Sequence, residues 1–147
     1  MDWILKKFKE LNSEDMYKIL RLRSEVFVIE QECIYEDCDG KDEKSYHLYL
    51  KNNGQIIAYL RILPKNISYK EMSIGRVVVK KSYRGHSIAS DMLKRAIQFI
   101  EKELNETEIR ISAQAHLINF YGNLGFKQTS DKYLEDGIPH IEMLYSN

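Results

Sequence analysis

One short segment of the chain has the residue types of an anion site: YRGHSIASDML, residues 83 to 93. The first backbone N–H groups of a helix have no partner in the chain and carry about half a positive charge. Such a helix start binds anions, and Arg84 can add a forked hydrogen bond to phosphate while Gly85 permits a tight turn. Taken alone, the segment indicates either a phosphate-binding loop or an ordinary solvated turn.

Two other charged features could contact a substrate. Arg76 interrupts an apolar run, MSIGRVVV, and because a buried unpaired guanidinium is costly, we expect it to be paired near a functional cleft. The segment from Glu30 to Lys44 is rich in Asp and Glu, which favours a cationic amine as ligand, although a solvated acidic loop is the more common reason for such a run. Cys33 and Cys38 lack a second pair of ligands, so we expect free thiols and no metal site.

Alternating strands and helices must position these residues. After the first strand, Asn12 can cap a helix whose apolar face includes Met16 and Phe27, and Ile88 to Leu104 repeats apolar residues at helical spacing. Asn52-Asn53-Gly54 predicts a hairpin, and Gly75 indicates a bulge. Expected strands cover Trp3–Leu11, Tyr46–Lys51, Gln55–Leu63, Met72–Val79, Glu108–Ala113, Gly125–Thr129 and Pro139–Tyr145, with a short helix at His116–Asn123. This order predicts an α/β fold with a mixed sheet and helices on its faces.

Composition narrows the function classes. The 147 residues fit one domain, 1–147, and 22 basic residues balance 22 acidic ones. A nucleic-acid-binding protein would show a basic excess, so we expect no nucleic-acid partner. The start, MDWILKKFKEL, has no apolar run long enough for a signal peptide or a membrane span. We therefore expect no membrane partner and a cytoplasmic location; a homodimer stays open.

Two motifs at a characteristic separation resemble one superfamily. The run VVVKKSYRGHSIA, residues 77 to 89, resembles the acetyl-CoA-binding segment of the GCN5-related N-acetyltransferase (GNAT) superfamily, which reads Gln or Arg, two residues, Gly, one residue, then Gly or Ala. Arg84 and Ala89 fill the outer positions, and Ser87 stands in place of the middle glycine. NFYGNLGF, residues 119 to 126, resembles the later motif, a helix with a tyrosine followed by Gly-Phe. FVIEQ, IGRVVV, AQAHLINFYGNLGF and EDGIPHIEM are similar to segments of the ElaA-type subfamily.

The resemblance implies a fold and a cofactor site. It implies a mostly antiparallel central sheet splayed between its fourth and fifth strands, with helices on both faces. Pantetheine would insert in the splay as an added half-strand, and the pyrophosphate would lie on the amides of the α-helix start. The implied acetyl-CoA ligands are Val77, Val78, Val79, Arg84, Gly85, His86, Ser87, Ile88, Ala89, Gln114 and Asn119.

The same resemblance implies direct transfer of an acetyl group from acetyl-CoA to an amine. Tyr121 can protonate the leaving thiolate because a phenol is still protonated at neutral pH. His116 is the candidate base because an imidazole titrates near neutral pH; it could equally cap the helix entry. Weaker candidates for the base are Glu30, His47 and His140. Gln114 and Asn119 either orient the ligands or satisfy backbone groups.

The acceptor is expected to be a small-molecule or protein amine, contacted by Glu30 and Arg76. Two alternatives remain at this point. One is a non-catalytic acyl-CoA-binding or sensing module, which Tyr121 argues against and Ser87 leaves open. The other is an acyltransferase that uses a longer acyl donor.

Overall fold

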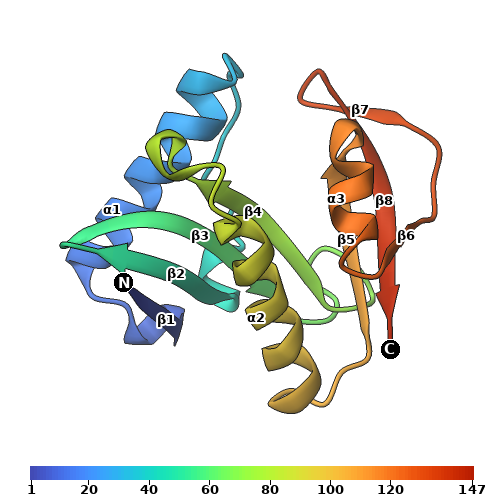
Figure 1. Ribbon diagram of the computed structural model, residues 1–147, viewed down its shortest axis with the longest axis horizontal. Helices are drawn as coiled ribbons and strands as arrows, with labels where there is room; N and C mark the ends of the chain where they lie inside the picture. Colours follow the sequence, from blue (N-terminus) through green and yellow to red (C-terminus); the bar gives the residue numbers. More distant parts are fainter.

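The protein consists of two sheets that meet at one end, with three helices against them (Figure 1). The computed structural model describes residues 1–147. The helices are α1 (Ser13–Arg23), α2 (Ile88–Lys102) and α3 (Ile118–Gly122). The strands are β1 (Asp2–Lys7), β2 (Tyr46–Asn52), β3 (Gln55–Leu63), β4 (Ser73–Val79), β5 (Glu108–Gln114), β6 (Phe126–Gln128), β7 (Tyr133–Glu135) and β8 (Ile138–Ser146).

The strand order explains where the sheets separate. The first sheet has the antiparallel order β1-β2-β3-β4, and the second has the order β5-β8-β6 with β7 also paired to β8. Between β4 and β5 there is one parallel bridge, Met72 to Ile109, beside a 2.8 Å hydrogen bond from the Arg110 N–H to the Met72 carbonyl. Beyond it the two strands diverge, as Figure 1 shows. The predicted splay between the fourth and fifth strands is confirmed.

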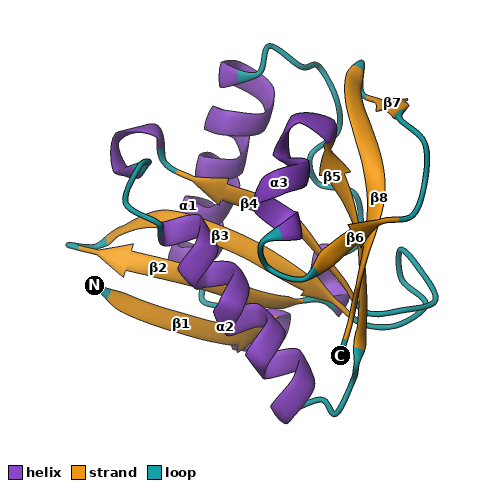
Figure 2. Cartoon of the chain, turned by 45° about the vertical axis from the view of Figure 1, so that its right-hand side comes forward, coloured by secondary structure: helices purple, strands orange, loops and turns teal.

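Helices cover both faces of the first sheet, also as predicted. Figure 2 shows α2 in front of this sheet and α1 behind it. The buried face of α2 joins the larger core, which includes Leu93, Ala96 and Ile100 and reaches into the second sheet. The smaller core lies under α1 and includes Ile19 and Leu22 packed on Tyr59. No helix combines the length and the apolar character needed to cross a lipid bilayer.

The first strand is shorter than the sequence predicts. The expectation of a strand from Trp3 to Leu11 is wrong beyond Lys7, where a single 3₁₀ turn, Phe8–Glu10, begins. The Lys7 N–H donates to Glu10 Oε1 at 2.8 Å, and this contact closes the turn. The predicted helix cap is confirmed, because the Asp15 N–H donates to Asn12 Oδ1 at 2.7 Å.

Two hairpins use residues with positive φ in their turns. Asn53 and Gly54, at φ 51° and 77°, join β2 to β3 as predicted. Asp136 and Gly137, also at 51° and 77°, join β7 to β8. The sequence interpretation had no strand β7, although Asp-Gly is a turn signal of the same kind.

A bulge interrupts β4 beside Gly75, which confirms the bulge that this glycine indicated. Tyr59 pairs with Val78 and Arg61 pairs with Gly75, so β4 contains one residue more than β3 over this interval. Arg76 takes the left-handed conformation, at φ 52°, which is uncommon for a residue with a side chain. The bulge therefore turns the Arg76 side chain out of the regular alternation of the strand.

Candidate functional site

An open cleft of about 1140 Å³ lies where the two sheets diverge. One wall is formed by β4 and the start of α2, and the other by β5, α3 and the turn before β8. The predicted site residues that line the cleft are Glu30, Arg76, Val77, Val78, Val79, Arg84, Gly85, Ser87, Ile88, Ala89, Gln114, His116 and Tyr121. His86 and Asn119 are exposed outside its lining. Most of the predicted residues therefore share one cavity, and these two do not reach it.

The start of α2 has the free amides of an anion site. The backbone N–H groups of residues 85 to 90 donate to no carbonyl of the chain. Gly85 and Ser87 both have positive φ, 86° and 61°, and Ser87 caps the helix without a side-chain hydrogen bond. Ser87 thus occupies a conformation that glycine takes more readily. All of residues 85 to 90 except His86 line the cleft, at the positive end of the helix dipole.

The Arg84 side chain is held beside this loop. Its Nε donates to the Val79 carbonyl at 2.9 Å, and its other nitrogens contact the Glu30 carboxylate. Hydrogen bonding by Arg84 holds the pKa of Glu30 below its usual value. Glu30, which was expected to contact the acceptor, therefore contacts a residue expected to contact the cofactor.

At the edge of β4 that faces the cleft, one backbone group is already occupied: the Val79 carbonyl accepts from Arg84 Nε. The Lys80 N–H donates to the Ile57 carbonyl of β3 at 2.8 Å. Because N–H and C=O groups alternate sides along a strand, the backbone groups of Val79 and Val77 point away from β3 and toward the open edge. The Val78 side chain, in contrast, is buried in the core under α1.

The Tyr121 side chain reaches the cleft from α3. Its ring packs edge-on against Phe120 and Phe126, at centroid distances of 5.1 and 5.9 Å. Burial raises the pKa of Tyr121 to about 12, so the phenol stays protonated through the neutral range. The hydroxyl has no partner in the chain and is not among the fully buried polar atoms. It is therefore free to donate to a group in the cleft.

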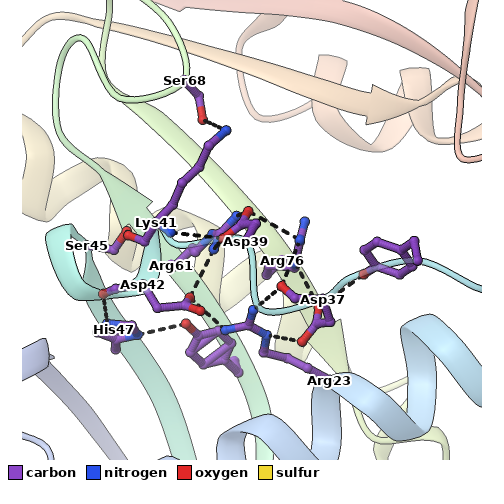
Figure 3. A network of polar contacts seen from close by, with 12 residues as sticks. Arg23, Asp37, Asp39, Lys41, Asp42, Ser45, His47, Arg61, Ser68 and Arg76 are labelled. Atoms are coloured by element: carbon purple, nitrogen blue, oxygen red, sulfur yellow. Dashed lines mark hydrogen bonds and ion pairs between the residues drawn. The ribbon is translucent and has the colours of Figure 1, made fainter.

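The acidic segment after α1 is an ion-pair network (Figure 3). Arg76 Nε lies 2.9 Å from Asp37 Oδ1, and its guanidinium lies 5.4 Å from the centre of the Tyr35 ring. The prediction that Arg76 is paired beside the cleft is confirmed. Asp37 also pairs with Arg23, at 2.8 Å.

Two further aspartates of this segment complete the network. Asp42 accepts from Arg23 at 2.7 Å and from Arg61 at 3.0 Å, and Asp39 pairs with Arg61. Burial alone would raise the pKa of Asp42, but the hydrogen bonds and charges of the two arginines outweigh it and hold this pKa below its usual value. Arginines therefore neutralise the aspartates of this segment, whereas its glutamates Glu32, Glu36 and Glu43 are exposed, as expected for a solvated acidic loop.

His116 and Gln114 lie on the second wall, where β5 ends. His116 is exposed, and no hydrogen bond fixes its ring. Gln114 pairs in register with His140 of β8, which is buried and lines the same cleft. No group of three His, Cys, Asp or Glu side chains could hold a metal ion.

Sequence reasoning missed two polar residues that line this wall, Ser112 and Glu135, and Tyr133 beside them. They are linked by hydrogen bonds from Ser112 Oγ, at 2.5 Å to the Tyr133 hydroxyl and 3.0 Å to Glu135 Oε1. The alternation in IRISAQ places Ser112 opposite the buried face of β5. The Asp-Gly turn would have placed the other two on a strand.

Comparisons with known proteins agree with this geometry. A family model described as an acetyltransferase (GNAT) domain matches residues 9–146. A UPF0039 protein of Synechocystis is 40% identical over 146 residues, which cover 99% of this chain and 95% of the relative. An acyl-CoA N-acyltransferase from Pseudomonas aeruginosa superposes with a TM-score of 0.94 at 40% identity, covering 99% of this chain and 100% of that one.

Escherichia coli ElaA is similar in both sequence and structure. Its sequence is 35% identical over 145 residues, covering 97% of this chain and 95% of ElaA. Its crystal structure gives a TM-score of 0.93 at 34% identity, with 99% of each chain covered. The family match spans nearly the whole sequence, and the splayed sheets form the cleft. The chain belongs to the GNAT family of acyl-CoA-dependent acyltransferases, among the ElaA-like members.

Proposed function

We propose that this protein transfers an acetyl group from acetyl-CoA to a primary amine, directly, while both substrates are bound. The observation that carries this proposal is the combination of free α2 amides and the open β4 edge in one cleft with the Tyr121 hydroxyl. The family membership supports an acyl-CoA as the donor. The acceptor would be a small-molecule or protein amine.

The wall formed by β4 and the start of α2 suits two parts of acetyl-CoA, the pyrophosphate and the pantetheine. The amides from Gly85 to Ser90 would receive the pyrophosphate, whose negative charge complements the helix dipole. The backbone groups of Val77 and the N–H of Val79 would pair with the amides of pantetheine, as an added strand would, while the Val79 carbonyl accepts from Arg84. The Ser87 amide faces phosphate in this arrangement, although its Cβ occupies space that glycine would leave open.

The transfer needs a polarised thioester, a neutral amine and a proton for the leaving thiolate. Tyr121 would supply the last of these, because its hydroxyl is free and remains protonated. A lysine-like amine costs about 4.6 kcal/mol to deprotonate at pH 7, and an α-amino group near pKa 8 costs about 1.4 kcal/mol. The remaining requirement is therefore a base in the cleft that deprotonates the amine.

Calorimetry followed by a thiol-release assay tests this proposal. Acetyl-CoA, propionyl-CoA and decanoyl-CoA are titrated into the protein, and thiol release is then followed with each donor across a panel of primary amines. We expect binding of acetyl-CoA and thiol release that requires an amine. Binding without amine-dependent release would make the protein an acyl-CoA-binding module, and faster release from decanoyl-CoA would identify a longer acyl donor. Absence of any binding would contradict all three functions.

A further inference from the structure

The second sheet presents a polar face to the cleft. Along β5, Ile109, Ile111 and Ala113 are buried in the core, so Ser112 and Gln114 lie on the opposite face. His140 of β8 is in register with Gln114 on one side and with Tyr133 of β7 on the other. Residues in register project from the same face of a sheet. This face therefore forms a polar wall of the cleft.

His140 has a fixed ring orientation within this wall. Its Nδ1 lies 2.7 Å from the Ile138 carbonyl, and because a carbonyl only accepts, Nδ1 carries the hydrogen. The ring also stacks on Tyr133, at an interplanar angle of 27°. In the neutral ring Nε2 then has a lone pair, and this atom lies 3.4 Å from Glu135 Oε2. Two hydrogen-bond acceptors thus lie next to each other, and a cationic N–H donor can contact both.

Glu135 is positioned but accessible. Ser112 Oγ donates to its Oε1 at 3.0 Å, while 48% of the Glu135 side chain is exposed. Tyr133 of β7, which stacks on the ring, has two further titratable neighbours: Tyr69 of the β3–β4 connection and Glu142 of β8, whose charge Arg110 of β5 compensates at 3.3 Å. Burial raises the pKa of Tyr69 to about 12 and also raises that of Tyr133, so both phenols stay neutral. No arginine or lysine is paired with Glu135.

We propose that Glu135 and His140 form the seat for the acceptor's ammonium group and that His140 Nε2 is the base. This inference rests on the proposed acetyl transfer. Of the two protons that the ammonium loses, one goes to Nε2 and from there to solvent. The nitrogen attacks the thioester carbon, the carbon–nitrogen bond forms and the carbon–sulfur bond breaks. Tyr121 gives its proton to the leaving thiolate, and the second proton from the nitrogen returns to Tyr121. The products are an amide and free CoA.

The structure favours His140 over His116 for this role. The His116 ring is exposed and unfixed, so it has no preferred direction toward an amine. His140 is 8% exposed and oriented by two contacts, and its Nε2 lies 3.4 Å from the Glu135 carboxylate. The seat also selects its ligand: a cationic primary amine satisfies both acceptors, and a neutral or anionic acceptor does not.

Two peptide acceptors test the assignment. One has an α-amino group as its only amine, and the other is N-acetylated and has a single lysine. We expect His140→Gln to lower kcat/KM about a hundredfold with the lysine peptide and less with the α-amino peptide, whose deprotonation costs less. The acid limb of the pH profile should move in this variant toward the pKa of the amine itself, while its Kd for acetyl-CoA stays at the wild-type value. Glu135→Gln should raise KM for both peptides more than it lowers kcat.

Three further measurements make the outcome decisive. Asp131→Asn is the control for Glu135→Gln, because Asp131 is an exposed acid outside the cleft lining. His116→Gln tests the competing assignment. A shift of the acid limb there instead of in His140→Gln overturns the inference, as does an unchanged pH profile in His140→Gln. If His140→Gln fails to fold, an unchanged KM in Glu135→Gln still overturns the seat. Failure of the wild type to release thiol with any amine would instead contradict the proposed acetyl transfer.

Discussion

The Arg84 guanidinium forms two hydrogen bonds with the Glu30 carboxylate, at 2.6 Å (Nη1–Oε2) and 3.0 Å (Nη2–Oε1). In this position Glu30 neutralises an arginine at the edge of the anion site. We predict that Glu30→Gln binds acetyl-CoA roughly three- to tenfold more tightly, because a negative charge near the proposed pyrophosphate site is removed. Calorimetry at low and high salt measures this, and the gain should shrink as salt screens the charges.

The matched control for this prediction is Glu25→Gln. Glu25 lies on the same π-helical segment, Ser24–Glu30, and pairs with Lys80 at 3.5 Å, away from Arg84. It should leave the affinity nearly unchanged. Equal or weaker binding by Glu30→Gln would show that Glu30 instead holds Arg84 in its productive position.

Ser87→Gly should stabilise the protein without weakening cofactor binding. A left-handed residue with a Cβ costs about 1–2 kcal/mol, and the greater freedom of glycine in the unfolded chain returns about half of that. We expect Tm to rise by roughly 1–4 °C in thermal unfolding. Ser82→Gly, at an exposed serine without positive φ, should lower Tm or leave it unchanged. A lower Tm for Ser87→Gly would contradict the prediction that the left-handed conformation of Ser87 destabilises the fold.

Tyr121→Phe should separate catalysis from binding. The phenol that would protonate the thiolate is removed while the packed ring remains, so we expect kcat to fall about a hundredfold with little change in the Kd for acetyl-CoA. Tyr83→Phe is the control, since Tyr83 also lines the cleft but its hydroxyl accepts a 3.0 Å hydrogen bond from Asn52. A parallel loss of cofactor affinity in Tyr121→Phe would mean that the hydroxyl is structural.

Asp42→Asn should destabilise the fold strongly. Asp42 accepts from Arg23, which is fully buried, and removing one member of a buried ion pair costs about 3 kcal/mol or more. Urea denaturation measures the loss of stability. The control is Glu14→Gln, which removes the exposed ion pair with Lys18 and should leave the urea midpoint unchanged. Since the pKa of Asp42 is depressed, its contribution is present above the usual carboxyl range and is lost as pH falls toward its native pKa.

His47 should make the free energy of unfolding depend on pH in a range closer to neutrality than Asp42 does. Burial lowers the pKa of His47, whose Nε2–H donates to the Asp42 carbonyl at 2.9 Å and whose Nδ1 accepts from the Tyr59 hydroxyl. Below about pH 6.5 the unfolded chain binds a proton that the native state does not, so the free energy of unfolding should fall by up to about 1.4 kcal/mol per pH unit. Urea denaturation between pH 7.5 and 5.5 should show this slope in the wild type and a smaller one in His47→Gln. An equal slope in the wild type and in His47→Gln would show that another group causes the pH dependence of stability.

Local patterns predicted the elements better than they predicted the contacts. The Asn53-Gly54 turn and the periodicity of α2 depend on neighbours in sequence, so the sequence was sufficient for them. The pairing of Arg76 with Asp37 joins a strand bulge to a loop 39 residues earlier, and only the folded chain brings them together. Similarly, the polar spacing of β5 predicted a strand but not that Ser112 would face Glu135.

The Met72 to Ile109 bridge has a mechanical consequence. It fastens the two sheets at the start of β4 and β5, whereas Val79 and Gln114 lie at their far ends. A small rotation about this hinge moves those far ends the most. The distance between the wall that would hold the cofactor and the wall that holds His140 is then set by what lies between them. An acyl-CoA arm in the cleft would act as the spacer that fixes this distance before the amine arrives.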